Sequence, residues 1–227
     1  MTVAPYLYRY DWGLIPGSLP ALAGGLGLTL QIASLSLALS LLLGLLVALC
    51  RMSPFKPLSL LAHAYIQVFR AIAIYVYILW VYFGLAAVLN INFDPLQAAV
   101  ISLTFLNSAY LAEVYRSSIS AVDAGQWEAA LAVGLSRVVA FSRVILPQAV
   151  SVALPMLVNQ YVTMIQDSSL VAVIGAGDLM YTTIRLASYY NRPFEFYTVT
   201  GLIYLAVVIV VSRLGTLLER RLKVSSQ

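Results

Sequence analysis

Residues 26–50 read LGLTLQIASLSLALSLLLGLLVALC, a run of 25 residues that contains no charged side chain. An α-helix rises about 1.5 Å per residue, so a helix of this length crosses the roughly 30 Å hydrocarbon core of a bilayer. The whole chain of 227 residues is 62% hydrophobic and 10% charged, with a mean hydropathy of +0.91. Soluble domains carry about 25% charged residues, and this composition excludes an ordinary one. The sequence therefore predicts an all-α integral membrane protein.

Further apolar segments follow this run, separated by stretches that contain charge, proline or asparagine. Two of them adjoin, and we interpret residues 58–70 as interfacial or buried in protein and residues 71–89 as the crossing. The remaining predicted spans are residues 96–112, 148–166 and 196–218. The sequence thus predicts about five transmembrane helices.

We expect one membrane domain over residues 26–222, with an external segment before it (1–25) and a short cytoplasmic tail after it (223–227). The longest polar stretch within the domain is a loop over residues 117–147. The first twenty residues do not show a basic segment followed by an apolar one, so we expect no cleavable signal peptide.

The basic residues are distributed unevenly among the predicted loops. With the N-terminus outside, the external segments hold three of them: Arg9, Arg185 and Arg192. The cytoplasmic side then holds nine: Arg51, Lys56, Arg116, Arg137, Arg143, Arg213, Arg220, Arg221 and Lys223. Because cytoplasmic loops are enriched in Lys and Arg, this bias predicts an external N-terminus and a cytoplasmic C-terminus. The net charge is +4, but the basic residues lie in the gaps between apolar segments and are not grouped on one face, so we expect no nucleic-acid partner.

Single cysteine and histidine residues limit the chemistry available to the chain. Cys50 has no second cysteine to pair with, so no disulfide forms within the chain. His63 has no partner at metal-ligand spacing and is interpreted as a packing or interfacial residue. We therefore expect no metal site and no cofactor in this chain.

The polar loop contains the pattern of a short amphipathic helix. Asp123 followed three residues later by Gln126 is similar to a capping box, and Gly134 is suited to end a helix. Ser136 is then placed to cap the next segment. The positions at helical spacing are Trp127, Ala130, Leu131 and Gly134. Such a helix either docks on a protein partner through its aromatic residue or rests on lipid, and the pattern alone leaves both open.

The same loop carries a longer motif with fixed spacing. Glu-Ala-Ala at residues 128–130, Gly134, and Val-Ile-Leu-Pro at residues 144–147 resemble the signature loop of binding-protein-dependent ABC importer permeases. The family usually has Ile where Val144 stands. The resemblance extends over roughly residues 24–222.

Three flanking stretches make the resemblance more specific. Residues 109–116 (AYLAEVYR), 145–149 (ILPQA) and 167–175 (DSSLVAVIG) are similar to the subfamily that imports polar amino acids and opines, of the histidine, glutamine and arginine type. This resemblance implies a type I ABC importer permease fold in a bacterial inner membrane, with an amino-acid-like solute.

The resemblance also implies partners. The chain would pair with a second permease subunit on two cytoplasmic ATPase subunits, with an extracytoplasmic solute-binding protein opposite and membrane lipid around it. The implied coupling residues are Trp127, Glu128, Ala129, Ala130, Leu131 and Gly134. The chain contains no Gly-rich phosphate-binding motif with Lys and Ser/Thr, so ATP and Mg²⁺ are expected on the ATPase and the permease is not an enzyme.

Polar residues near the fourth predicted span are candidates for the solute path. A charge such as Asp167 is costly inside a membrane and requires a partner or a water-filled cavity. It either lies on the path, together with Arg70 and Ser168, or forms a structural pair with Arg70 or a helix cap. Asn159 and Gln160 either line a cavity or form hydrogen bonds between helices.

Two departures from the subfamily pattern concern the partner subunit. Arg70 is normally followed by Gly-Thr-Pro, whereas Ala-Ile-Ala occupies residues 71–73 here. Gln166 stands where the subfamily often has Lys. Because apolar side chains offer a polar solute few hydrogen bonds, we expect a heterodimer with a more polar permease rather than a homodimer.

Two alternatives within the membrane class are a secondary transporter component and a membrane assembly or anchor protein. The sequence shows no repeat of 20–50 residues, and inverted repeats are typical of secondary transporters. An anchor protein explains the apolar helices but not the ordered motif over residues 128–147.

Overall fold

The computed structural model describes residues 9–224, with side chains through residue 220. Residues 1–8 and 225–227, parts of the predicted external segment and the predicted tail, lie outside the described residues. Helices and short connections make up the described part, which contains no strand. In chain order the elements are α1 (Leu14–Arg51), α2 (Lys56–Ala71), α3 (Ile74–Leu79), η1 (Trp80–Leu85), α4 (Ala86–Leu89), α5 (Pro95–Ser120), α6 (Ala124–Ala132), α7 (Arg137–Ala140), η2 (Phe141–Ile145), α8 (Leu146–Asp167), η3 (Ser168–Ile174), α9 (Leu179–Tyr190) and α10 (Pro193–Val224).

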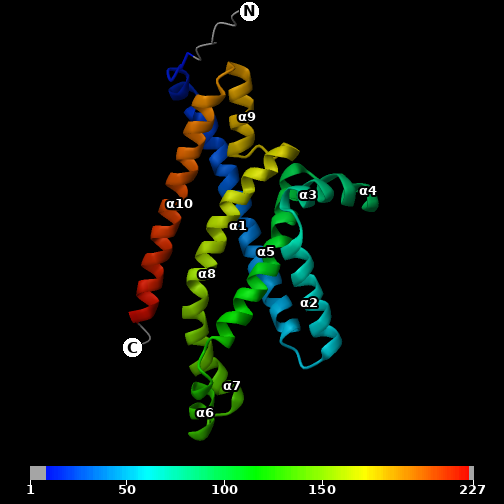
Figure 1. The fold of residues 1–227 in the computed structure, drawn as a ribbon, viewed down its shortest axis with the longest axis vertical. Coiled ribbons are helices and arrows are strands. Elements are labelled where there is room, and N and C mark those ends of the chain that lie inside the picture. The colour runs from blue at the N-terminus through cyan, green and yellow to red at the C-terminus, as the bar shows by residue number, and fades with distance from the viewer. Residues whose placement is uncertain (1–8, 225–227) are drawn as a thin grey trace, which may run out of the picture.

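The long helices run roughly along the longest axis of the molecule (Figure 1). Helix α1 descends from the end at which α9 lies, α2 returns alongside it, and α5 descends again. The short helices α6 and α7 form the opposite tip, from which α8 ascends to α9 and α10 descends along the outside. The tip and α9 therefore lie at opposite ends of the molecule.

Four helical segments in the described part are long and apolar enough to cross a membrane, and a bent pair raises the number to five. The four are Leu14–Arg51, Pro95–Ser120, Arg137–Ile174 and Pro193–Arg220. The predicted spans 96–112, 148–166 and 196–218 each lie inside one of these helices. The all-α membrane fold with about five spans is thus confirmed.

The first helix begins twelve residues before the predicted span and includes residues 14–25 of the segment predicted to be external. Helix α1 starts at Leu14 and contains Pro20 in its interior. Its early turns are held by contact with α9: a Cβ added to the buried Gly25 would lie 2.8 Å from Thr182 Oγ1. A proline within a helix normally disfavours it, and here tertiary packing overrides that local preference.

The structure does not follow the predicted division into an interfacial segment over residues 58–70 and a crossing over residues 71–89. Ile72 and Ala73 adopt extended backbone conformations, and the helices on either side, α2 and the α3–α4 segment, meet at 105°. Helix α2 therefore runs along the bundle, whereas α3, η1 and α4 turn away across it (Figure 1). Both segments are apolar, and composition alone does not report the direction of a helix.

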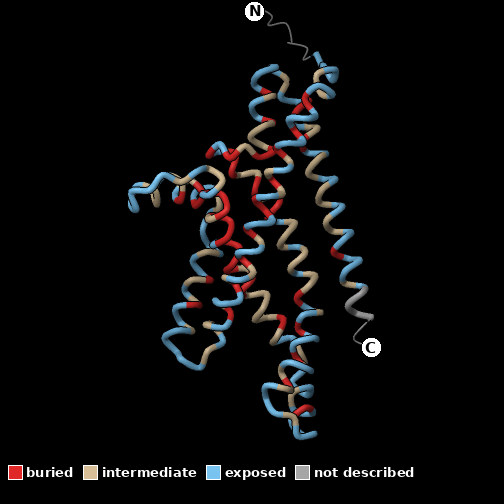
Figure 2. Tube along the Cα trace, turned by 180° about the vertical axis from the view of Figure 1, so that it is seen from behind, coloured by how far each residue is buried: buried red, intermediate tan, exposed pale blue. Residues whose placement is uncertain are grey.

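Burial differs strongly among the long helices. Helix α5 is largely buried, and buried positions concentrate along α1 and α5 and where these meet η3 and α9 (Figure 2). Most of α10 is exposed, including Leu202, Leu205 and Leu214. Exposed leucines along a helix of this length identify a surface that faces lipid or another membrane subunit.

The most extensive helix–helix contact joins α1 to α5. Small residues of α1 lie at this contact: Ser36, Ser40, Gly44 and Ala48. Small side chains let two membrane helices approach closely and gain dispersion energy and hydrogen bonds where no hydrophobic effect separates helix from lipid. Ser40 Oγ donates to the carbonyl oxygen of Thr104 at 3.1 Å, and Ser36 Oγ to that of Val100 at 3.5 Å.

Gly44 lies at a close approach of α1 to α5. A Cβ there would lie 2.9 Å from Leu111 Cβ and 2.9 Å from the Ser108 carbonyl oxygen. Both obstacles are atoms at or near the α5 backbone, which cannot move aside as the end of a flexible side chain would. The position therefore requires glycine for close approach, not for its conformational freedom.

We predict that Gly44→Ala destabilises the protein by about 1–3 kcal/mol, the usual cost of overpacking a core. Gly27→Ala is the matched control, because Gly27 lies on the same helix with no atom within 4 Å of its added Cβ. Thermal unfolding in detergent measures both variants. Equal unfolding temperatures for the two variants would contradict the assignment of Gly44 to a tight contact.

Candidate functional site

The tip of the molecule is built from locally encoded helix signals. The Asp123 carboxylate accepts a hydrogen bond from the Gly125 backbone N–H at 2.6 Å and so caps α6. Gln126 does not complete the expected capping box, because its side-chain oxygen accepts a hydrogen bond from Gln148 Nε2 at 3.3 Å. The predicted N-terminus is therefore confirmed, and Gln126 connects α6 to α8 instead.

Gly134 ends α6 as the sequence predicts. Its φ of +84° lies in the left-handed region, which glycine occupies without strain. The Gly134 N–H donates to the Leu131 carbonyl at 3.0 Å and the Leu135 N–H to the Ala130 carbonyl at 3.2 Å. These two bonds form a Schellman motif. Ser136 then caps α7 by accepting from the Val139 N–H, also as predicted.

The predicted apolar stripe of α6 is covered by the protein at two of its positions and exposed at the other two. The Trp127 ring stacks on Phe141 of η2, with centroids 6.3 Å apart, and Ala130 is buried. Leu131 and Gly134 are exposed. Trp127 therefore holds α6 against η2 and is only partly available as an anchor for a partner, because helical spacing shows which residues share a face but not which neighbour covers it.

The outer side of the tip is apolar and open. Val133 and Val138 are each 77% exposed, and Leu131 is 42% exposed. With the exposed Glu128, Ala129 and Ala132 they form what we call the tip surface: Glu128, Ala129, Leu131, Ala132, Val133 and Val138. The α6–α7 tip projects beyond the ends of the long helices (Figure 1). An exposed apolar patch rimmed by polar residues at such a place is typical of a protein-docking surface.

Beside the tip, α6 and the start of α8 enclose a hollow of about 600 Å³. Gln126, Arg143 and Gln148 line it, and Gln148 also donates to the Val144 carbonyl at 2.9 Å. The Gln126–Gln148 hydrogen bond thus joins the tip to the base of α8, a membrane-spanning helix.

Two of the predicted path residues lie in the middle of α8. Gln160 Nε2 donates at 2.5 Å to the side-chain oxygen of Asn107, a fully buried residue of α5. Asn159 is exposed, one position away on the helix. Gln160 therefore forms a hydrogen bond between helices, one of the two roles that the sequence left open, whereas Asn159 faces an open side.

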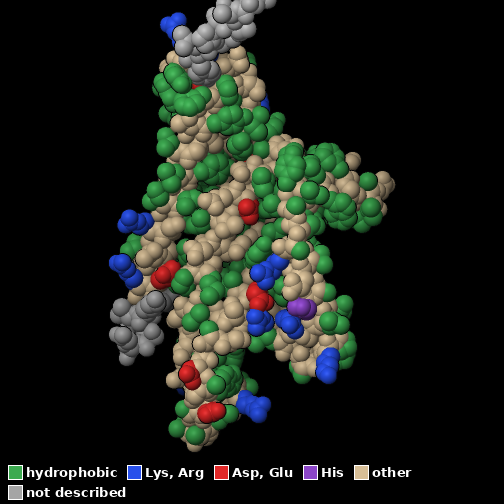
Figure 3. All heavy atoms as spheres, viewed as in Figure 1, with side chains coloured by type: hydrophobic (Ala, Val, Ile, Leu, Met, Phe, Trp, Pro, Cys, Tyr) green, Lys and Arg blue, Asp and Glu red, His purple; other side chains and the backbone are tan. Residues whose placement is uncertain are grey.

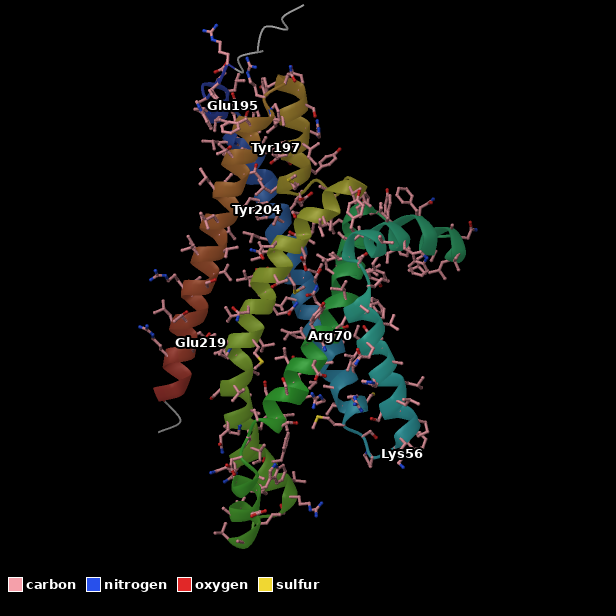
Figure 4. The ribbon with its side chains drawn as sticks, in the orientation of Figure 1. Lys56, Arg70, Glu195, Tyr197, Tyr204 and Glu219 are labelled. Atoms are coloured by element: carbon pink, nitrogen blue, oxygen red, sulfur yellow. The ribbon has the colours of Figure 1, made fainter. Side chains whose placement is uncertain are left out.

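Arg70, on the neighbouring helix α2, contacts the same part of α5 as Gln160 of α8 does. Its guanidinium carbon lies 5.4 Å from the centre of the Tyr110 ring, within the range of a cation–π interaction. Tyr110 follows Asn107 by three positions, one turn along α5. Arg70, on the last turn of α2, is labelled in Figure 4. The structure thus brings Arg70 and Gln160 to adjacent positions along one helix.

Asp167 ends α8 and is half-buried. Its carboxylate does not cap η3, and it takes part in no ion pair within the described residues, where Glu113 pairs with Arg116. Ser168 is fully buried, and its hydroxyl donates to the Ile165 carbonyl at 2.7 Å. Neither structural role foreseen for Asp167, the pair with Arg70 or the cap, is present in this structure.

A second buried carboxylate has a purely structural role. Asp178 caps α9, accepting the Met180 N–H at 3.0 Å and the Tyr181 N–H at 3.3 Å. Burial raises the pKa of Asp178 to about 6, although the backbone hydrogen bonds act to lower it. Both oxygens are occupied by backbone groups, which leaves this carboxylate unavailable to a solute.

Sequence reasoning missed Asn107 and Tyr110 as members of the polar site. A buried amide within an apolar span is itself a signal, because such a group requires a hydrogen-bond partner. Asn107 meets this need through Gln160 and through the Leu103 carbonyl, to which its Nδ2 donates at 2.8 Å. Among the described residues, no group of three His, Cys, Asp or Glu side chains is arranged to hold a metal ion.

Comparisons with known proteins agree with this arrangement. Residues 40–224 match the family described as binding-protein-dependent transport system inner membrane component. The chain is 35% identical over 213 residues to the arginine transport system permease protein ArtQ of Bacillus subtilis (strain 168), covering 94% of this chain and 97% of the relative. It is 35% identical over 217 residues to the glutamine transport system permease protein GlnP of Escherichia coli (strain K12), covering 95% and 99%.

A solved structure shows the same fold. The crystal structure of an amino acid ABC transporter with histidines superimposes with a TM-score of 0.90 at 36% sequence identity, covering 94% of this chain and 100% of that chain. These similarities do not favour a secondary transporter component or an anchor protein. The spanning helices, the capped tip with its fixed spacing and the match over residues 40–224 together show that the chain belongs to the binding-protein-dependent inner membrane transport components, as a multi-pass permease.

Proposed function

We propose that this chain is the permease subunit of an ATP-driven importer for a polar amino acid. The observation that carries the proposal is the tip surface, an open apolar patch on a rigidly capped helix that lies beyond the spanning helices. The relatives named for arginine and glutamine transport support the class of solute.

In this proposal the tip surface docks on a cytoplasmic ATPase subunit. The assembly has two ATPase subunits, which carry ATP and Mg²⁺, and an extracytoplasmic solute-binding protein at the opposite end. When the ATPases close, they move α6, and the Gln126–Gln148 hydrogen bond and the Trp127–Phe141 stack transmit the movement to α8. The permease itself converts that movement into alternating access and performs no covalent chemistry.

The proposed orientation rests on the distribution of charge. The tip contains Arg137 and Arg143, and the lower end of α2 contains Lys56. We therefore place this end in the cytoplasm, with α9 outside. Cysteines introduced at the exposed Ser136 and Ser188, in a Cys50→Ser background, lie at opposite ends of the molecule. Labelling of both from one side of the membrane would contradict this orientation.

The solute path is proposed along the open side of α8. Asn159 is exposed and Asp167 is half-buried with no ion pair among the described residues, and Arg70 contacts α5 one turn away from the Asn107–Gln160 bond. A carboxylate without a protein partner suits the cationic ammonium group of an amino acid, and Arg70 suits its carboxylate. Ser168 positions the junction between α8 and η3 through its bond to Ile165.

We further propose that the second permease subunit is a different chain. Residues 71–73, Ala-Ile-Ala, are exposed at the bend after α2, close to Arg70 in the sequence. Exposed apolar side chains there give a polar solute no hydrogen bonds, so a partner with a polar bend would supply them. A transport-competent complex that contains a single permease species by mass would contradict the heterodimer.

The docking role of the tip surface predicts a loss of coupling in Val133→Asp. A charge buried without a partner in an interface abolishes docking, and we expect solute-stimulated ATP hydrolysis to fall at least about tenfold. Gly134→Val has the same effect by straining the left-handed end of α6. Ser142→Asp is the control, because Ser142 is exposed in the same loop but outside the tip surface. Wild-type hydrolysis in Val133→Asp would contradict docking at this surface.

The path proposal predicts that Asp167→Asn lowers uptake of labelled L-arginine at least about tenfold, because a charge-assisted contact contributes about 1.5–3 kcal/mol. Basal ATP hydrolysis stays unchanged, since Asp167 is remote from the tip in the chain fold. Glu219→Gln provides the control, with the same charge change on the outer helix α10. If both variants transport L-arginine equally, Asp167 does not contact the solute.

A further inference from the structure

The turn between α1 and α2 forms a basic hollow of about 630 Å³. Arg51 from the end of α1 lines it, together with Lys56, Ser59 and His63 from α2. The three α2 residues are spaced at i, i+3 and i+7, so they share one face of the helix. Figure 3 shows His63, the one histidine of the chain, among Lys and Arg side chains at this end.

The arginine at this hollow is held in place. Arg51 Nη1 donates to Ser59 Oγ at 2.9 Å, and the Ser59 hydroxyl donates back to the Arg51 carbonyl at 2.8 Å. This reciprocal pair fixes part of the guanidinium and leaves its other N–H groups directed to no described partner. A fixed guanidinium that retains free donors is suited to a phosphate group.

The hollow has no acidic side chain to balance its charge. No Asp or Glu occurs between Asp11 and Asp94, a stretch that contains all of α1 and α2. Glu113 of α5 is influenced by the charge of Arg51, but it forms its ion pair with Arg116. The net charge of the hollow is therefore positive, and it attracts an anion from outside the chain.

Leu60 lines the hollow, and further large apolar side chains near the α1–α2 turn are exposed. Phe55 is 63% exposed, Leu60 68% and Leu61 70%, while Leu49 on the facing end of α1 is 59% exposed. These residues cannot face water without cost, whereas acyl chains cover them at no such cost. A basic, hydroxyl-lined hollow beside open leucines matches a molecule with an anionic head and an apolar body.

We propose that the α1–α2 turn is a binding site for an anionic phospholipid, with the phosphate held by Arg51 and Lys56 and the acyl chains against Leu60. The site lies outside the proposed solute path and the tip surface, and its placement in the cytoplasmic leaflet rests on the proposed orientation. Anionic lipids attract basic residues there by about 1 kcal/mol each, and basic pockets between spanning helices bind such head groups. The lipid would fix the turn that connects the first two helices.

Native mass spectrometry of the full-length chain in its transporter complex tests the site, with phosphatidylglycerol and phosphatidylcholine as probes. Lys56→Gln is expected to weaken phosphatidylglycerol retention about fivefold, the loss equivalent to one basic residue at an anionic surface. The Lys56 side chain makes no hydrogen bond in the described structure, so this variant is expected to leave the fold intact. Arg213→Gln is the control, because Arg213 is an exposed basic residue on α10 outside the hollow. Phosphatidylcholine retention is expected to be weak and equal in all three proteins.

Three outcomes would overturn the proposal. Equal phosphatidylglycerol retention in Lys56→Gln and Arg213→Gln would show that general surface charge binds the lipid. Equal retention of both lipids by the wild type would show that only the apolar surface matters. Displacement of phosphatidylglycerol by millimolar inorganic phosphate, with phosphate itself bound in a Lys56-dependent way, would assign the hollow to free phosphate rather than to lipid.

Discussion

The close contact between α1 and α5 is the constraint on which the rest of the structure depends. Lipid is as apolar as a leucine side chain, so these helices associate through close packing and hydrogen bonds rather than through hydrophobic burial. Gly44 lets the backbones meet, and the Ser40 hydroxyl donates to the α5 backbone. Helix α2 then packs on the same pair, where Tyr65 donates to the Phe105 carbonyl at 3.0 Å. Helix α8 packs on the other side of α5, which therefore forms the axis of the molecule.

Because α5 is central, its polar side chains form contacts with both neighbouring helices, α2 and α8. Asn107 accepts a hydrogen bond from Gln160 of α8, and the Tyr110 ring, one turn along α5, contacts the Arg70 guanidinium of α2. This turn of α5 therefore contacts both α8 and α2. The same helix α8 is connected at its lower end to the tip through Gln148 and Gln126. A displacement of α6 by a docked partner thus has a continuous packed route to the residues proposed to contact the solute.

The two surfaces at the lower end of the molecule serve different partners in this picture. The tip surface is largely apolar and includes small alanine side chains, and both ends of its helix α6 are capped. These properties suit docking of a rigid protein. The α1–α2 turn combines uncompensated positive charge with large open leucines, properties that suit a lipid. Neither surface is part of the buried core, so the exposed side chains of these two surfaces are not required for the helices to pack. Their residues are free to meet the demands of an external partner.

The sequence by itself determined the membrane class, three of the spans, the start and end of α6 and the cap at Ser136, because charge-free length, Asp123 and Gly134 act locally. It did not determine the direction of residues 71–89, since apolar composition is the same whether a helix crosses the bundle or turns away at Ile72. The early start of α1 also required tertiary contact, at Gly25 against α9. The outward face of α6 and the pairing of Asn107 with Gln160 were likewise decided by which helices became neighbours. Periodicity specifies that residues share a face, and only packing decides what that face meets.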